Sequence, residues 1–146
     1  MRKLSSLIGF MVLSLTLFCS CSNNKATEPV QPTAPTVSTI AVSSIAETTA
    51  ECGGTITSDG GAAVTARGVC WSMNATPTTA DSITTDGTGA GNFTSSLTGL
   101  TAGTPYYVRA YAANSVGTGY GSVDSFTTTA PSYQMLLSTF DTDLED

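Results

Sequence analysis

Short runs of β-branched and aromatic residues, separated by turn residues, are the feature that most constrains the fold of this 146-residue chain. Between residues 37 and 128 these runs recur at intervals of about 8–12 residues, with Gly, Asp and Asn clusters between them. No stretch there has a helical period. The pattern predicts strands at 37–43, 48–57, 63–72, 81–85, 92–97, 104–114 and 119–128. Such a series of short strands is typical of a two-layer β-sandwich, so we expect an all-β fold.

The sixth of these runs has the clearest alternation in the chain. Successive side chains of a strand point to opposite faces, so the run divides into two sets. One set, expected to face the core, consists of Tyr106, Val108, Ala110 and Ala112. The outward set contains Tyr107, Arg109 and Tyr111, which form a candidate binding patch. Sugars stack on aromatic faces and protein partners use Tyr and Arg as anchors, although ordinary cross-strand pairing on a solvated sheet explains the same residues.

Residues 97–121, LTGLTAGTPYYVRAYAANSVGTGYG, resemble the E–F corner, F strand and F–G loop of fibronectin type III domains. The matching positions are Leu100, Gly103, Thr104, Tyr106, Val108, Ala112, Asn114 and Gly117. The resemblance implies a seven-stranded fibronectin type III/immunoglobulin-like sandwich over residues 37–128. The family carries a Trp on its second strand, where this chain has Gly54. We therefore expect Trp71, the single Trp of the chain, to fill the space opposite Gly54.

The N-terminus is typical of a secretory signal peptide. Two basic residues precede an apolar run at residues 7–18, which is shorter than the ~20 residues of a membrane-spanning helix. The end of the run resembles a bacterial lipobox, which implies a lipoprotein signal peptide at residues 1–20 and acylation of Cys21. Several acyl chains anchor a protein stably to a membrane. Because Ser22 is not the Asp that retains lipoproteins in the inner membrane, we expect a lipid-anchored outer-membrane protein that faces the periplasm or the cell surface.

Two segments of low complexity flank the expected domain. Residues 21–36 contain three prolines among Thr, Gln, Ala and Asn, with no apolar period, so we expect a disordered tether. Residues 129–146 end in a cluster of acidic side chains. Apolar residues recur there at i, i+3, i+4 and i+7, which predicts a short C-terminal helix between residues 132 and 144.

Two of the four cysteines remain once the signal peptide is removed and Cys21 is acylated. Cys52 and Cys70 are an even pair in an oxidising compartment, and a disulfide between them would add about 3 kcal/mol by the loop-entropy model. Two separate thiols are the alternative, because Cys70 faces outward if Val69 and Trp71 face the core. A catalytic or metal-bound thiol is disfavoured, since no neighbouring base is available to activate it.

Composition excludes several kinds of chemistry. The chain has no His, which excludes His-based triads and zinc sites that use His. After cleavage three basic and 11 acidic residues remain, so the net charge of 3 − 11 = −8 argues against a nucleic-acid partner. Asp81 and Asp86 lack the remaining spacing of a calcium loop. We therefore expect no enzyme activity, no cofactor and no metal site.

These observations predict a non-catalytic, lipid-anchored module of the cell envelope that binds a partner or acts as a spacer. The module would contact the membrane through its N-terminal lipid. It would also contact an unidentified protein or glycan, as in adhesion, carbohydrate binding or protein binding. The alternative is an accessory domain of an extracellular hydrolase system, or a truncated piece of a larger lipoprotein. Sandwiches of this type carry many functions, so the fold alone does not choose between these alternatives.

Overall fold

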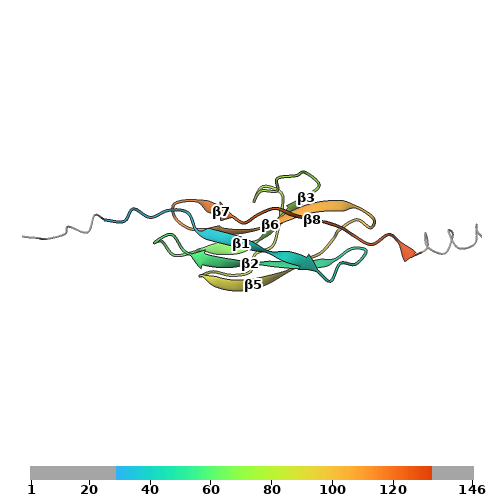
Figure 1. Ribbon diagram of the computed structural model, residues 1–146, viewed down its shortest axis with the longest axis horizontal. Helices are drawn as coiled ribbons and strands as arrows, with labels where there is room; N and C mark the ends of the chain where they lie inside the picture. Colours follow the sequence, from blue (N-terminus) through green and yellow to red (C-terminus); the bar gives the residue numbers. More distant parts are fainter. Residues whose placement is uncertain (1–28, 133–146) are drawn as a thin grey trace, which may run out of the picture.

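The computed structural model describes residues 29–132, which form two antiparallel sheets packed face to face (Figure 1). The first sheet has the order β1 (Thr36–Ser43), β2 (Ala50–Ser58), β5 (Gly91–Leu97). The second has the order β4 (Ser82–Ile83), β3 (Ala66–Ser72), β6 (Pro105–Ala113), β7 (Thr118–Tyr120), and β8 (Asp124–Thr127) also pairs with β6. The predicted all-β sandwich is confirmed. The signal peptide, Cys21 and the predicted helix beyond Ser132 lie outside the described residues.

The described residues form eight strands rather than seven, because the run at 119–128 is divided into β7 and β8. β1 comes close at this break, and a β-carbon at Gly121 would overlap Thr39. The Thr39 hydroxyl accepts a hydrogen bond from the Ala110 N–H at 3.1 Å and donates one to the Ser122 carbonyl at 2.6 Å. A single side chain therefore satisfies the backbone groups that the interrupted ladder leaves free.

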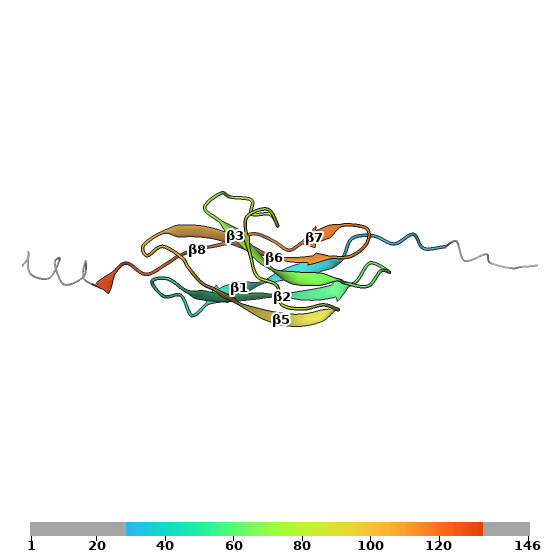
Figure 2. The ribbon, with the colours of Figure 1, turned by 180° about the vertical axis from the view of Figure 1, so that it is seen from behind.

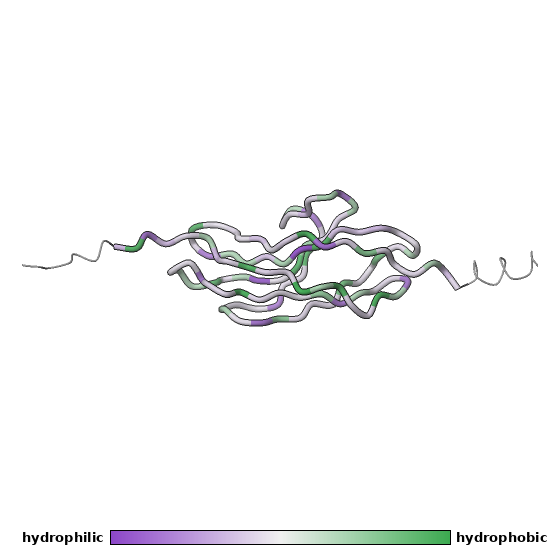
Figure 3. The backbone as a smooth tube through the Cα atoms, viewed as in Figure 1, coloured by the Kyte–Doolittle hydropathy of each residue, from purple (hydrophilic) through white to green (hydrophobic). Residues whose placement is uncertain are grey.

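The core lies between the two sheets and is built mainly from small aliphatic and aromatic side chains. Figure 3 shows near-neutral hydropathy along much of the chain, in keeping with its many Thr, Ser, Gly and Ala residues. The buried cluster consists of Ala50, Cys52, Ile56, Val64, Val69, Phe93, Leu97, Leu100, Tyr106, Val108, Ala110, Ala112 and Phe126. All four residues predicted on the inner face of the sixth run belong to it.

The expectation that Trp71 fills the space opposite Gly54 is wrong. A β-carbon at Gly54 would lie 2.8 Å from Cζ of Phe93 and 2.6 Å from Cβ of Ala110, so these side chains occupy the space. Phe93 reaches it because it is paired with Gly54 across β2 and β5. Trp71 instead lies opposite Val108 at the margin of the core, where it is half-buried.

A hydrogen bond fixes the corner between β5 and β6. The Tyr106 hydroxyl accepts a hydrogen bond from the backbone N–H of Thr101, five residues upstream, at 3.1 Å. The Tyr106 ring also stacks on Phe126, with 5.8 Å between the ring centroids. This arrangement is the tyrosine corner of immunoglobulin-like sandwiches.

The folded domain begins before the predicted boundary at residue 37. The Thr33 N–H donates to the Gly60 carbonyl at 2.8 Å, and the Thr33 carbonyl accepts from Nδ2 of Asn114 at 2.7 Å. Pro35 is buried. Residues 33–36 are therefore packed on the sandwich and are not part of a free tether. The described chain enters and leaves the sandwich at opposite ends of its long axis (Figure 1).

Candidate functional site

The predicted patch on the outer face of β6 is covered by another part of the chain. Residues 73–81, here called the 73–81 loop, connect β3 to β4 and project from the second sheet (Figure 2). Tyr111 is only 4% exposed, and its hydroxyl donates to the Thr84 carbonyl at 2.8 Å. Tyr107 and Arg109 are half-buried. The sequence placed the three side chains on one face correctly, but that face does not present an open aromatic surface.

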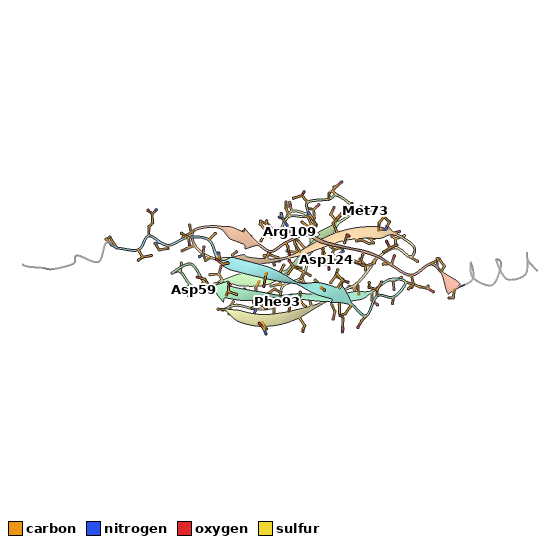
Figure 4. The ribbon with its side chains drawn as sticks, viewed as in Figure 1. Asp59, Met73, Phe93, Arg109 and Asp124 are labelled. Carbon is orange, nitrogen blue, oxygen red and sulfur yellow. The ribbon has the colours of Figure 1, made fainter. Side chains whose placement is uncertain are left out.

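Arg109, labelled in Figure 4, contacts the 73–81 loop through its side chain. Its guanidinium lies over the Tyr120 ring, 3.9 Å from the ring centroid, and its Nε donates to the Pro77 carbonyl. The Tyr120 hydroxyl in turn accepts a hydrogen bond from the Thr79 N–H at 3.2 Å. The guanidinium group of Arg109 is therefore engaged in contacts within the domain.

The second arginine of the described chain is engaged in the same way. The side chain of Arg67 donates to the carbonyls of Asp86, Gly89 and Ala90, each at 3.1 Å. It also lies over Phe93, 5.5 Å from the ring centroid. These contacts organise the glycine-rich turn after β4. Both arginines of residues 29–132 are half-buried and contact carbonyls and aromatic rings of the domain itself.

Both cysteines of the described domain are free and buried, so the disulfide alternative is not what the structure contains. Cys52 lies on the inner face of the first sheet and its thiol donates to the Ile40 carbonyl at 3.2 Å. Cys70 faces away from the core, where its thiol contacts the Arg109 carbonyl at 3.6 Å. Their opposite orientations follow from strand alternation. Burial raises the pKa of each thiol, which makes both unreactive at neutral pH.

The carboxylates of Asp86 and Asp124 each accept hydrogen bonds from other groups of the domain. Oδ2 of Asp86 accepts hydrogen bonds from the hydroxyls of Thr84 and Ser95. Asp124 accepts from the Val42 N–H, which ties β8 to β1. Within residues 29–132 no three acidic or cysteine side chains come together as metal ligands. The same residues include no helix long and apolar enough to span a membrane.

A small hollow, which the sequence did not predict, opens beside Trp71. It has a volume of about 340 Å³ and lies between β3, β4, β6, the 73–81 loop and the connection from β5 to β6. Its lining residues are Trp71, Ser72, Met73, Asp81, Ser82, Gly99 and Tyr106. Strand alternation in the sequence places Trp71 with Val69 on the core-facing side of its strand and gives no signal of a hollow. This hollow combines aromatic surface, a carboxylate and hydroxyl groups.

Comparison with family models gave no match, and comparison with curated protein sequences gave none either. Among solved structures, the sensor domain of the anti-sigma factor RsgI4 of Pseudobacteroides cellulosolvens is similar, with a TM-score of 0.50 and 16% identity. The match covers 68% of this chain and 98% of that chain.

A fibronectin type III domain of human fibronectin type III domain containing protein 3 matches with a TM-score of 0.46 and 16% identity, over 73% of this chain and 94% of that chain. The sixth fibronectin type III domain of a human protein with the same description matches with a TM-score of 0.44 and 23% identity, over 75% of this chain and 94% of that chain. The strand order and the tyrosine corner on Tyr106 define the class: the described chain is a fibronectin type III-like sandwich.

Proposed function

We propose that this chain is a non-catalytic binding or spacer module of the bacterial cell envelope, held on the outer membrane by a lipid on Cys21. One observation carries the proposal: the described chain enters and leaves the sandwich at opposite ends of its long axis (Figure 1). An anchor that precedes residue 29 would set one end of the sandwich toward the membrane. The opposite end and the Trp71 hollow would then face a protein or glycan partner.

Two features support a binding or spacer role over catalysis. The carboxylates of Asp86 and Asp124 are each engaged by neighbouring hydroxyl or backbone groups within the domain. The thiols of Cys52 and Cys70 are buried, and burial raises the pKa of both. An accessory domain of an extracellular hydrolase system is the second candidate. The chain enters and leaves the sandwich at opposite ends, so the domain could connect two other domains of a longer protein. A reading frame that continues into a hydrolase domain would favour this second candidate.

The lipid anchor is tested by metabolic labelling with a palmitate analogue in the bacterial host. We expect the protein to be labelled and to sediment with outer membranes, and we expect Cys21→Ala to lose both properties. Cys52→Ala is the matched control and should keep both, because its thiol is buried in the folded domain. Labelling that persists in Cys21→Ala would contradict the anchor.

A further inference from the structure

The hollow beside Trp71 has the size of a small-ligand site. Its volume of about 340 Å³ lies within the range of ~300–1,000 Å³ that is common for such sites. Its wall combines residues of β3, β4 and β6 with the 73–81 loop and the connection between β5 and β6. Met73, which is 68% exposed, lies at its outer margin (Figure 4).

Trp71 gives the hollow an aromatic wall. Its side chain is partly buried, packs against the core cluster and also lines the hollow. The side-chain hydrogen bonds within residues 29–132 include none from the Trp71 indole. Among these residues no fully buried side-chain nitrogen lacks a partner, so the indole nitrogen is not fully buried. A flat apolar ring with a free donor at its edge is therefore available to a ligand.

Asp81 adds an acceptor that is already oriented. Its Oδ2 accepts hydrogen bonds from the N–H of Thr78 at 2.8 Å and from the Thr78 hydroxyl at 3.1 Å. These bonds lower the pKa of Asp81, which keeps the carboxylate ionised. The Ser72 side chain also hydrogen-bonds to Asp81 and lowers this pKa further, and the exposed carboxylate can accept an additional hydrogen bond from a ligand. Ser82, the next residue in the chain, also belongs to the lining.

We propose that this hollow is a subsite for a neutral sugar ring, an assignment that rests on the binding role proposed above. The C–H face of a pyranose is apolar and packs on an indole, whereas its hydroxyls donate to a carboxylate and accept from an N–H. Trp71 and Asp81 supply these groups on one hollow. An acidic sugar is excluded by the Asp81 charge, because Arg67 and Arg109 are both engaged elsewhere.

Trp71 is the single Trp of the chain, so it serves as an intrinsic probe of this subsite. No other Trp contributes to the emission that is measured. We would titrate the mature lipidated protein, in a polyoxyethylene detergent without sugar headgroups, with glucose, galactose, N-acetylglucosamine, their neutral oligosaccharides and glucuronic acid. We expect a saturable change in Trp71 emission with a neutral sugar, with Kd on the order of 1 mM for a single ring.

Variants then assign the binding to the hollow. Asp81→Asn keeps the side-chain shape and should weaken binding about 10-fold, since it replaces a charge-assisted hydrogen bond by a neutral one. Asp59→Asn is the matched control, because Asp59 is an exposed carboxylate distant from Met73 (Figure 4), and should leave the affinity unchanged. Trp71→Phe, followed by calorimetry, should also weaken binding because the indole N–H is lost.

Three results would overturn the subsite: no saturable response to any neutral sugar, equal affinity in Asp81→Asn and the unmodified chain, or a preference for glucuronic acid. Thermal unfolding of each variant shows whether it is folded. If Trp71→Phe does not fold, the affinity of Asp81→Asn alone tests the subsite. Loss of lipid labelling with sugar binding intact would contradict the anchor alone. Labelling without sugar binding would contradict the subsite alone.

Discussion

The Phe93 ring occupies the space that a side chain at Gly54 would need. A β-carbon at Gly54 would lie 2.8 Å from Cζ of Phe93, and the two residues are direct partners across β2 and β5. The aromatic side chain that fills the space beside Gly54 thus comes from β5, the neighbouring strand of the same sheet. Gly54 is the residue that makes room for it.

Gly54→Ala should therefore destabilise the domain. The added methyl group meets Phe93 and Ala110, and overpacking of this kind lowers the free energy of unfolding by about 1–3 kcal/mol. Gly117→Ala is the control, because its β-carbon would meet nothing closer than 4.0 Å and its backbone is not left-handed. Urea unfolding measures both. Equal stabilities of the two variants would contradict the assigned role of Gly54.

The tyrosine corner makes a second prediction. Tyr106→Phe keeps the ring in the core but removes the acceptor of the Thr101 N–H, so the free energy of unfolding should fall by about 1–2 kcal/mol. Exchange of the Thr101 amide hydrogen should become faster at the same time. Tyr107→Phe, on the other face of β6, serves as the control. Unchanged protection of Thr101 in Tyr106→Phe would show that this hydrogen bond does not hold the corner.

Arg109→Lys tests how the 73–81 loop is held. Lysine keeps the charge but lacks the planar guanidinium that stacks on Tyr120 and donates to Pro77, so we expect a loss of about 1 kcal/mol. Hydrogen exchange should accelerate at Thr79, whose N–H donates to the Tyr120 hydroxyl. Arg67→Lys should instead accelerate exchange in the turn at residues 86–90. The same exchange pattern in both variants would refute the separate roles of the two arginines.

The buried thiols predict how stability depends on pH. Burial raises the pKa of Cys52 and of Cys70 above the ordinary value of 9.0, so the folded state keeps protons that the unfolded state releases. The free energy of unfolding should therefore be level near neutral pH and fall as the pH rises past about 9. Burial also raises the pKa of Tyr111, which extends the fall above pH 10. Cys52→Ala combined with Cys70→Ala should flatten the slope near pH 9, and an unchanged slope would assign it to other groups.

The faces of β6 could be predicted from the sequence because strand alternation is a local property. The run from Tyr106 to Ala112 needs no information from other strands to place its inner and outer side chains. The tyrosine corner could also be predicted from sequence, because Tyr106 and Thr101 are only five residues apart. The two-sheet fold followed from the number and spacing of the runs.

Features that depend on distant parts of the chain were not predicted. The patch around Tyr111 is closed by contacts with Pro77 and Thr84, which belong to a different connection. The choice between Trp71 and Phe93 beside Gly54 depends on how β5 pairs with β2. The hollow beside Trp71 is formed by two connections, the 73–81 loop and the one from β5 to β6, together with residues of three strands. Sequence periodicity carries no information on these long-range contacts.

The placement of the two chain ends has a mechanical consequence. β1 starts at one end of the sandwich and β8 finishes near the other (Figure 1), so tension between the ends pulls these strands in opposite directions along their length. The β1–β2 and β6–β8 ladders, together with the Val42–Asp124 bond at 3.2 Å, are then loaded in shear at the same time. Bonds loaded together break at a higher force than bonds peeled one after another, so the domain resists extension along its long axis.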